Sequence, residues 1–232
     1  MKLATWLGRS VPEDAPVRAL FDARFYLSAN RFDAPPNTGD PIDHYMRYGA
    51  RAGLRPHPLV DPAYVAEQLG LRKPGGDDIL APLLAADGPS PNRLFEPDLY
   101  LESLPEGVAV EAPPVLHFLE TWPDHRARFS RVFDPAFYAR GLAEGLGPRD
   151  NPLVHYLLTP PDQRADANPM FHAGYYRMAT GREVWDPLSD FMAYGAAAGH
   201  LPNPYAADEL GEGRPDAAAL LAYITLKTGR GA

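Results

Sequence analysis

A short pattern of apolar, acidic and aromatic residues recurs five times, and its period constrains the fold more than any other feature of the chain. The acidic or polar residue of the pattern stands at positions 22, 61, 96, 134 and 172, so the copies follow one another at intervals of 35 to 39 residues. The copies are Leu20–Tyr26, Leu59–Val65, Leu94–Tyr100, Val132–Tyr138 and Met170–Tyr176. A fixed period of this length indicates a repeat architecture, in which each unit buries its apolar face against its neighbours.

The first half of each unit predicts a helix start. A carboxylate before the helix accepts hydrogen bonds from the unpaired N–H groups of the first turn, and a proline at the first helical position sacrifices no hydrogen bond. An aromatic residue precedes the cap and a tyrosine follows five residues later, which is the spacing of a hydrophobic staple. The expected caps are Asp22, Asp61, Glu96 and Asp134, and His172 takes this place in the fifth unit.

The second half of the unit predicts another short helix. Asp40, Asn151 and Asp186 each precede a proline, and apolar residues then follow at helical spacing. Gly49 and Gly195 come at the end of two of these segments, and we expect them to act as C-cap glycines. Neither helix of a unit is long enough to be stable alone, so the units must pack on one another.

These signals predict an all-α fold of tandem helix pairs, either an open solenoid-like stack or a compact globule of repeats. Helices are expected to begin within about two residues of positions 22, 61, 96, 134 and 172, and near 40, 78, 151 and 186. The expected organisation is an N-terminal cap segment (1–19), five repeats (20–58, 59–93, 94–131, 132–169 and 170–204) and a partial sixth repeat or C-terminal cap (205–232).

Composition excludes several classes of function. The formal net charge is −8 and the pI is about 5.3, which argues against a nucleic-acid-binding protein. The chain has no cysteine, so disulfides, thiolate catalysis and cysteine-bound zinc are excluded. The first eight residues form too short an apolar run for a signal peptide, and no stretch approaches the ~20 apolar residues of a membrane span. We therefore expect a cytoplasmic protein.

The repeats resemble a family of accessory repeats found in bacterial polysaccharide-biosynthesis proteins, where they are attached to glycosyltransferase domains. The resemblance covers residues 20–204, and in the first unit it is carried by Phe21-Asp22, Tyr26-Leu27, Asn30, Asp40-Pro41, His44-Tyr45, Gly49, Gly53 and Pro56. Pro82 in the second unit and Trp122-Pro123 in the third depart from the pattern. The resemblance implies an accessory role and assigns no catalytic residue to this chain.

The recurring polar residues favour structure over chemistry. The carboxylates stand one unit apart at helix starts, where they are expected to cap helices. His44, His117 and His155 occupy one position of the second helix, and Asp190 replaces them in the fifth unit. Metal ligands must converge within a few ångströms, whereas equivalent positions of stacked units lie further apart. We expect these histidines to bridge neighbouring units by hydrogen bonds, and we expect no catalytic residue, metal site or cofactor.

A ligand site is predicted instead from residues that do not recur. His125–Arg131 is a local basic segment in an acidic chain, and Arg126 and Arg164 occupy corresponding loop positions in adjacent units. Planar guanidinium groups suit phosphate, sulfate or carboxylate. The candidate binding residues are Trp122, Arg126, Arg128, Arg164 and Trp185. The alternative is that the basic loops pair with local acids and that the tryptophans fill gaps between units.

The sequence therefore predicts a non-catalytic interaction or scaffold module that binds a protein partner or an anionic glycan. Two alternatives stay open: a protein that binds glycans directly, and an enzyme whose site the sequence does not reveal. An exposed apolar surface would favour the scaffold, and exposed tryptophan or tyrosine beside polar groups would favour the glycan binder. Titratable groups that converge in a cleft would favour the enzyme.

Overall fold

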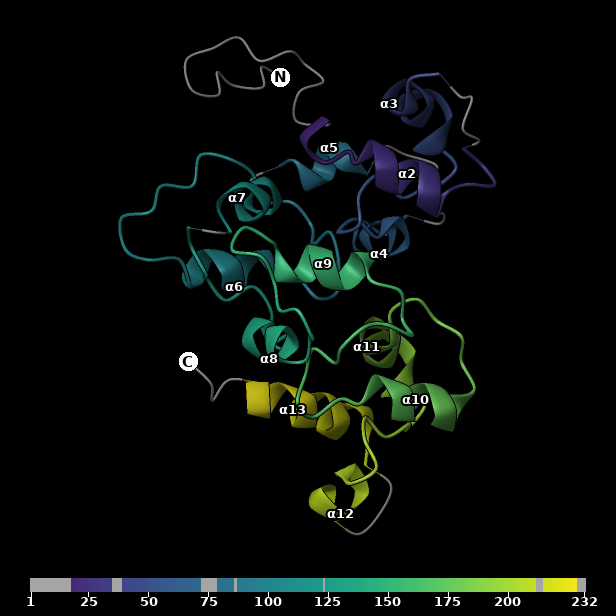
Figure 1. Cartoon of the computed structure of the whole chain (residues 1–232), viewed down its shortest axis with the longest axis vertical. Helices are drawn as coiled ribbons and strands as arrows, with labels where there is room; N and C mark the ends of the chain where they lie inside the picture. The colour runs from purple at the N-terminus through teal and green to yellow at the C-terminus, as the bar shows by residue number, and fades with distance from the viewer. Residues whose placement is uncertain are drawn as a thin grey trace. The chain divides into compact units, whose positions relative to one another are not determined.

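The computed structural model of the chain describes residues 18–34, 39–71, 79–85, 87–122, 124–211 and 215–228. The chain forms two compact structural units, Met1–Ala127 and Arg128–Ala232, each of which contains more than one of the sequence repeats. From here on, 'unit' means one of these two and 'repeat' means one copy of the recurring sequence. Within the described ranges every regular element is a helix, and extended pairing is limited to one isolated bridge between Asn168 and Phe171. The expected all-α character is therefore confirmed (Figure 1). The predicted N-terminal cap lies outside the described residues, except for positions 18 and 19.

The helices are short and follow the predicted order. The first unit contains α2 (Ala23–Ala29), α3 (Pro41–His44), a π-helical turn η1 (Tyr45–Gly49), α4 (Pro62–Gln68), α5 (Leu80–Leu83), α6 (Pro97–Glu102) and α7 (Pro114–Thr121). The second unit contains α8 (Pro135–Arg140), α9 (Pro152–Leu158), α10 (Ala173–Thr180), α11 (Pro187–Asp190), a π-helical turn η2 (Phe191–Gly195), α12 (Ala206–Leu210) and α13 (Ala217–Thr228). Each predicted helix start is confirmed to within two residues.

The predicted caps act as expected, with one exception. Asp134 Oδ1 accepts from the backbone N–H groups of Ala136 and Phe137, both at 2.9 Å, and the remaining caps make equivalent bonds. Those caps are Asp22, Asp40, Asp61, Asn151, His172 and Asp186. The exception is Glu96, which has the extended backbone of an N-cap but makes no side-chain bond to the first turn of α6. The extra methylene of glutamate is the physical reason, because the preferred capping side chains are short.

A cluster of three aromatic rings holds each helix pair together in four of the five repeats. The staple aromatic lies 5.1–5.7 Å from the tyrosine of the first helix, and a ring from the second helix meets that tyrosine edge-on at 5.4–5.7 Å. Edge-on packing places the positive rim of one ring against the negative face of the other. The clusters are Phe21/Tyr26/Tyr45, Phe95/Tyr100/Phe118, Phe133/Tyr138/Tyr156 and Phe171/Tyr176/Phe191. The second repeat buries aliphatic residues instead: Leu59, Val60, Val65, Leu80 and Leu83.

The buried tyrosine of each cluster is hydrogen-bonded to the second helix of the same repeat. Its partners are the Nδ1 atoms of His44, His117 and His155, each 2.7 Å from Tyr26, Tyr100 or Tyr138 Oη respectively, and Asp190 Oδ2, which accepts from Tyr176 Oη at 2.6 Å. Burial, with a smaller contribution from Asp33, raises the pKa of Tyr26 to about 12, so the hydroxyl keeps its proton. Burial also raises the pKa of Tyr100 and Tyr138.

The expected C-cap role of Gly49 and Gly195 is wrong, and the tyrosine hydroxyls explain why these residues are glycines. Both residues lie inside the π-helical turns, and the residues with left-handed backbone that follow them are Gly53 (φ 71°) and Gly199 (φ 72°). A Cβ atom on Gly195 would lie 2.5 Å from Tyr176 Oη, and one on Gly49 would overlap Tyr26 Oη. The glycines therefore leave room for the buried hydroxyl.

Adjacent sequence repeats are joined by a turn that the sequence analysis did not recognise. At each turn a polar side chain accepts a hydrogen bond from the backbone N–H of the residue two positions later, at 2.8–3.2 Å. The backbone N–H of the first-helix cap in the preceding repeat donates to the carbonyl of the residue just before the turn residue. These bonds run from Asp22 to Pro56, from Asp61 to Pro91, from Asp134 to Ala167 and from His172 to Pro202, at 2.8–2.9 Å. The turn residues are His57, Asn92, Ser130, Asn168 and Asn203.

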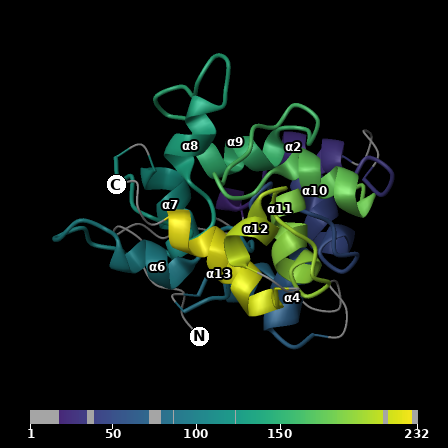
Figure 2. The ribbon, with the colours of Figure 1, turned by 90° about the horizontal axis from the view of Figure 1, so that it is seen from below.

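The last helix packs against the turns at Asn168 and Asn203, and the role of residues 205–232 as a partial sixth repeat or C-terminal cap stays a prediction. In α13, drawn in yellow in Figure 2, Leu220 and Ile224 are buried. Asn168 Nδ2 donates to the carbonyl of Ile224 at 3.2 Å, and Asn203 Nδ2 lies 3.3 Å from Tyr223 Oη. One helix thus contacts the turns of two successive repeats.

Removing the cap of α8 tests the predicted role of the carboxylates. Asp134→Ala is expected to lower the free energy of unfolding by roughly 0.5–2 kcal/mol, because two backbone N–H groups lose their acceptor. Asp134→Asn keeps the acceptor oxygen and should retain most of the stability. Urea denaturation monitored by circular dichroism measures both variants. Equal stability of the alanine variant and the parent would show that the bonds to Ala136 and Phe137 contribute nothing.

Replacing the glycine of η2 with alanine is expected to change the stability in the direction opposite to the usual one. Glycine to alanine inside an exposed helix normally stabilises a protein, by roughly 0.5–1 kcal/mol. Gly195→Ala is expected to do the opposite and cost about 1–3 kcal/mol, because the methyl group meets the Tyr176 ring and hydroxyl. The midpoint of urea denaturation decides the sign, and a stabilised variant would contradict the role proposed for this glycine.

Candidate functional site

The three repeated histidines serve the fold within single repeats. We expected them to bridge neighbouring repeats, but each is hydrogen-bonded to the tyrosine of its own helix pair, which corrects that prediction. His117 is the most buried of them, and burial, then His125, lowers its pKa. In the third and fourth repeats a threonine one turn later, Thr121 or Thr159, donates back to the histidine carbonyl at 2.6–2.7 Å. Over the described residues no group of three or more histidines or acidic residues converges as metal ligands do.

His57 must be neutral for its turn to keep its side-chain hydrogen bond. Its Nδ1 accepts from the backbone N–H of Leu59 at 3.1 Å, which a protonated ring cannot do. Burial lowers the pKa of His57 from 6.5 to about 4, Arg55 acts in the same direction, and Asp22 opposes the shift. The asparagines at the equivalent turns supply the same acceptor without titrating.

A pH dependence of stability follows from this lowered pKa. Well above pH 6.5 His57 is neutral in both the folded and unfolded states and has no effect. Between pH 6.5 and 4 the unfolded chain binds more protons, so stability falls as the pH falls, by at most about 3 kcal/mol. Denaturation at pH 7 and pH 5 measures the loss.

The matched variant is His57→Asn, because asparagine occupies this turn at positions 92, 168 and 203. The variant should retain the turn and lose less stability than the parent between pH 7 and pH 5. The lowered pKa of His117 leaves a residual loss of the same sign in both proteins. Identical losses in parent and variant would exclude His57 as a source of the acid sensitivity.

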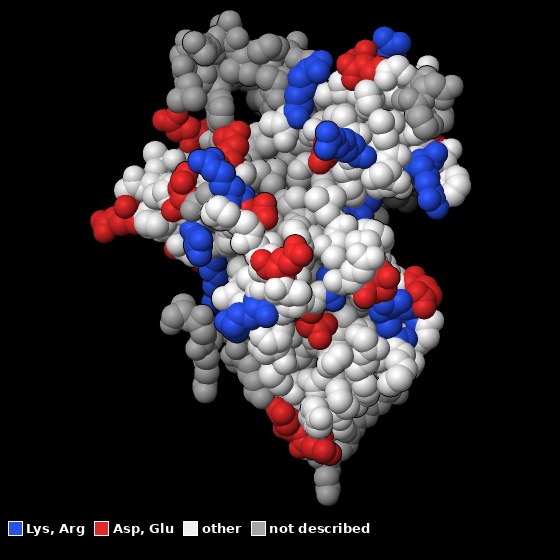
Figure 3. All heavy atoms as spheres, in the orientation of Figure 1, with Lys and Arg blue, Asp and Glu red and all other residues white. Residues whose placement is uncertain are grey.

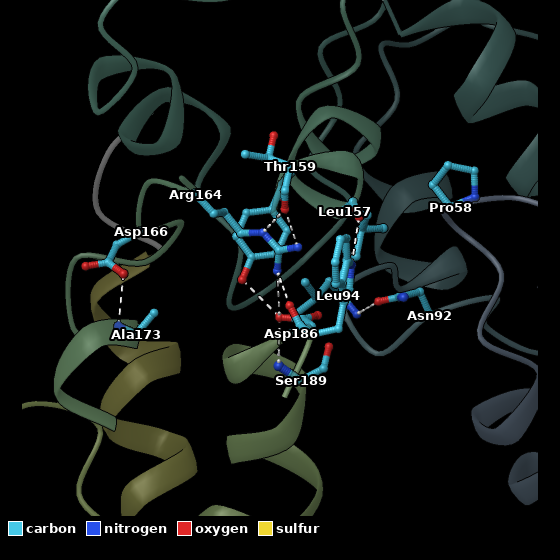
Figure 4. A network of polar contacts seen from close by, with 12 residues as sticks. Pro58, Asn92, Leu94, Leu157, Thr159, Arg164, Asp166, Ala173, Asp186 and Ser189 are labelled. Carbon is cyan, nitrogen blue, oxygen red and sulfur yellow. Dashed lines mark hydrogen bonds and ion pairs between the residues drawn. The ribbon is translucent and has the colours of Figure 1, made fainter. Parts of the chain in front are cut away.

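Arg164 forms the centre of a polar network in the second unit (Figure 4). Its Nε and Nη2 donate to the carbonyl of Thr159 at 2.9 and 2.6 Å, and its Nη1 donates to the carbonyl of Trp185 at 2.8 Å. The guanidinium lies 4.3 Å from the centre of the Tyr156 ring and 5.5 Å from that of Trp185. The side chain is only 3 % exposed. Arg164 therefore ties the loop after α9 to the segment before α11.

Asp186 supplies the negative charge in this network. Its Oδ1 accepts from Tyr156 Oη at 2.9 Å and from the backbone N–H of Ser189 at 3.3 Å, and it lies 3.9 Å from Arg164 Nη1. Burial is the main cause that raises the pKa of Tyr156 well above its usual value, and the Asp186 carboxylate adds to it. Tyr156 therefore keeps its proton and donates a hydrogen bond to Asp186. The cap of α11 is at the same time the counter-ion of a buried arginine.

Trp185 is fixed at both its backbone and its side chain. Its carbonyl accepts from Arg164, and its indole Nε1–H donates to the carbonyl of Leu157 at 3.0 Å. The residue nevertheless remains 46 % exposed. Two of the predicted site residues, Arg164 and Trp185, are thus brought together, but the arginine points inward and the tryptophan presents surface.

The remaining predicted site residues have different surroundings. Trp122 is 7 % exposed and packs edge-on against Phe118 at 5.6 Å, so it fills the core at the end of α7. Arg126 and Arg128 are exposed, and Arg128 Nε lies 3.4 Å from the carbonyl of Ser130. Arg126 belongs to the first unit and Arg164 to the second. A shared role for these two arginines stays a prediction.

The fifth repeat carries an ion pair where the others carry a histidine. Arg182 binds Asp190 with two hydrogen bonds, Nε to Oδ2 at 2.8 Å and Nη2 to Oδ1 at 2.6 Å. Asp190 is buried and also accepts from Tyr176. The replacement of histidine by Asp190 was predictable from the sequence but its partner was not, because Arg182 lies in the loop between α10 and α11, away from the recurring positions.

The surface has no dominant charge on the face drawn in Figure 3, where basic side chains lie singly or in small groups among acidic ones. In the parts of the chain that the structure describes, no helix is long and apolar enough to cross a membrane. No protein-family model matches the sequence, and no curated protein or solved structure shows significant similarity to it.

Proposed function

We propose that this chain is a non-catalytic interaction module, a cytoplasmic stack of helix pairs that holds a partner protein in cell-surface polysaccharide synthesis. The link to polysaccharide synthesis rests on the sequence resemblance. The binding role is supported by the way polar groups are used: the recurring tyrosine, histidine and aspartate side chains bond to groups of their own repeat. They maintain the fold, and binding is assigned to the residues that do not recur.

The basic segment at residues 125–131 is the proposed contact for an acidic partner. Arg126 and Arg128 are exposed, and they stand out in a chain of net charge −8. Attraction between such exposed charges and an acidic surface, or an anionic glycan, is screened over ~8–10 Å at moderate ionic strength. Binding through this segment is therefore expected to weaken as salt is added.

The test is a charge-matched comparison of two double variants. The immobilised chain captures partners from cells of its source organism at low salt, and Arg126→Ala/Arg128→Ala is expected to lose a captured protein by about tenfold or more. Arg24→Ala/Arg47→Ala removes the same charge from exposed positions elsewhere and should retain it. Undiminished, salt-insensitive capture by a folded Arg126/Arg128 variant would exclude the basic segment as the contact.

Direct glycan binding is a second candidate, and one observation favours it. Trp185 exposes nearly half of its surface although hydrogen bonds fix both its backbone and its indole. A fixed, exposed aromatic face beside polar groups is the kind of surface on which a sugar ring stacks.

A further inference from the structure

The residue before the second-helix cap does not need to be tryptophan for the repeat to fold. The equivalent residues are Gly39 in the first repeat and Asp150 in the fourth, and both repeats form the same capped second helix. Trp185 therefore adds something that the helix pair itself does not require. Its position is also the one place in the fifth repeat where a large aromatic ring is exposed and hydrogen-bonded at the same time.

Arg164 removes the freedom that an exposed tryptophan would otherwise have. Its guanidinium is satisfied by the carbonyls of Thr159 and Trp185 and by Asp186, and it lies under the Trp185 ring at 5.5 Å. The indole N–H is held by Leu157. A ring fixed before binding loses little conformational entropy when a ligand packs on it.

The same contacts argue against an anion as the ligand at this place. Arg164 is 3 % exposed and already faces the carboxylate of Asp186, which is 12 % exposed. The loop that Arg164 closes carries the exposed residues Asp162 and Gln163, a carboxylate and an amide. Asp162 repels an anionic ligand, whereas both side chains suit hydroxyl groups as hydrogen-bond partners.

We infer that the exposed indole face of Trp185 is a stacking platform for a neutral saccharide ring, that Asp162 and Gln163 contact its hydroxyl groups, and that Arg164 is a positioning residue. This inference rests on the proposed binding role and concerns a different surface from the basic segment. The C–H bonds on one face of a pyranose carry partial positive charge and meet the negative face of the indole, while the hydroxyl groups at the ring edge stay in contact with water and polar side chains.

The probe is a set of neutral hexose oligomers, namely cellohexaose, maltohexaose and mannohexaose, with hexagalacturonate as the anionic comparison. Binding is followed by the indole N–H and backbone amide signals of the ¹⁵N-labelled full chain. The Trp185 indole signal is assigned by its loss in Trp185→Phe, and the backbone amide signals measure the affinity of the variants that lack this indole. The buried Trp122 serves as an internal reference. Stacking on one ring discriminates weakly between hexoses, so at least one neutral oligomer must shift the Trp185 signal below about 10 mM, with little effect of salt.

The variants separate stacking from folding and from charge. Trp185→Ala is expected to weaken binding at least about tenfold, whereas Trp185→Phe keeps a ring and retains part of the affinity. Tyr194→Ala removes another exposed ring of the second unit and is expected to leave the affinity for the neutral oligomer unchanged. Arg164→Lys loses the guanidinium that bonds to the carbonyls of both Thr159 and Trp185. The substitution should therefore broaden or split the Trp185 signal of the ligand-free protein and weaken the binding of neutral oligomers.

Three results would overturn the inference. One is a Trp185 signal that no neutral oligomer shifts. Another is tighter, salt-sensitive binding of hexagalacturonate that Arg164→Lys selectively removes. The third is equal affinity of the folded Trp185→Ala variant. None of these measurements involves Arg126 or Arg128, so the capture experiment judges the partner-binding proposal independently.

Discussion

The tyrosine hydroxyl buried in each aromatic cluster determines which residues can surround it. A hydroxyl without a partner in an apolar interior costs roughly 1–3 kcal/mol, so the second helix must present a hydrogen-bond partner at that point. A histidine does so in three repeats and an aspartate in the fifth. The aspartate brings a charge into the core, and Arg182 compensates for it. The hydroxyl also excludes a side chain at Gly49 and Gly195.

The second repeat shows what happens when the hydroxyl is absent. Val65 takes the place of the tyrosine, no acceptor is needed, and the second helix shrinks to Leu80–Leu83. Pro82 lies within that short helix and removes one backbone donor. The divergence of this repeat is visible in its sequence, and it accompanies an apolar core that requires no polar partner.

Local signals made the helix starts predictable from the sequence, whereas contacts between segments were not. A cap such as Asp134 and the proline after it act within four residues, so their spacing carries the information. Spacing does not say whether His155 meets the tyrosine of its own repeat or of the next one. The turns at His57, Asn92 and Ser130 escaped notice because three residue types supply the same acceptor. Arg164 was predicted to be free for a ligand because nothing in the sequence places Asp186 beside it.

The bond between the two helices has a consequence for how such repeats diverge. The residues that it joins are 18, 17, 17 and 14 positions apart in the four repeats that have it, while the bond length stays at 2.6–2.7 Å. The loop between the helices can therefore change in length and composition without disturbing the core, since closing a slightly longer loop costs little free energy. New surface chemistry can arise there by insertion or deletion while the helix pair remains intact, much as binding loops vary on other rigid scaffolds.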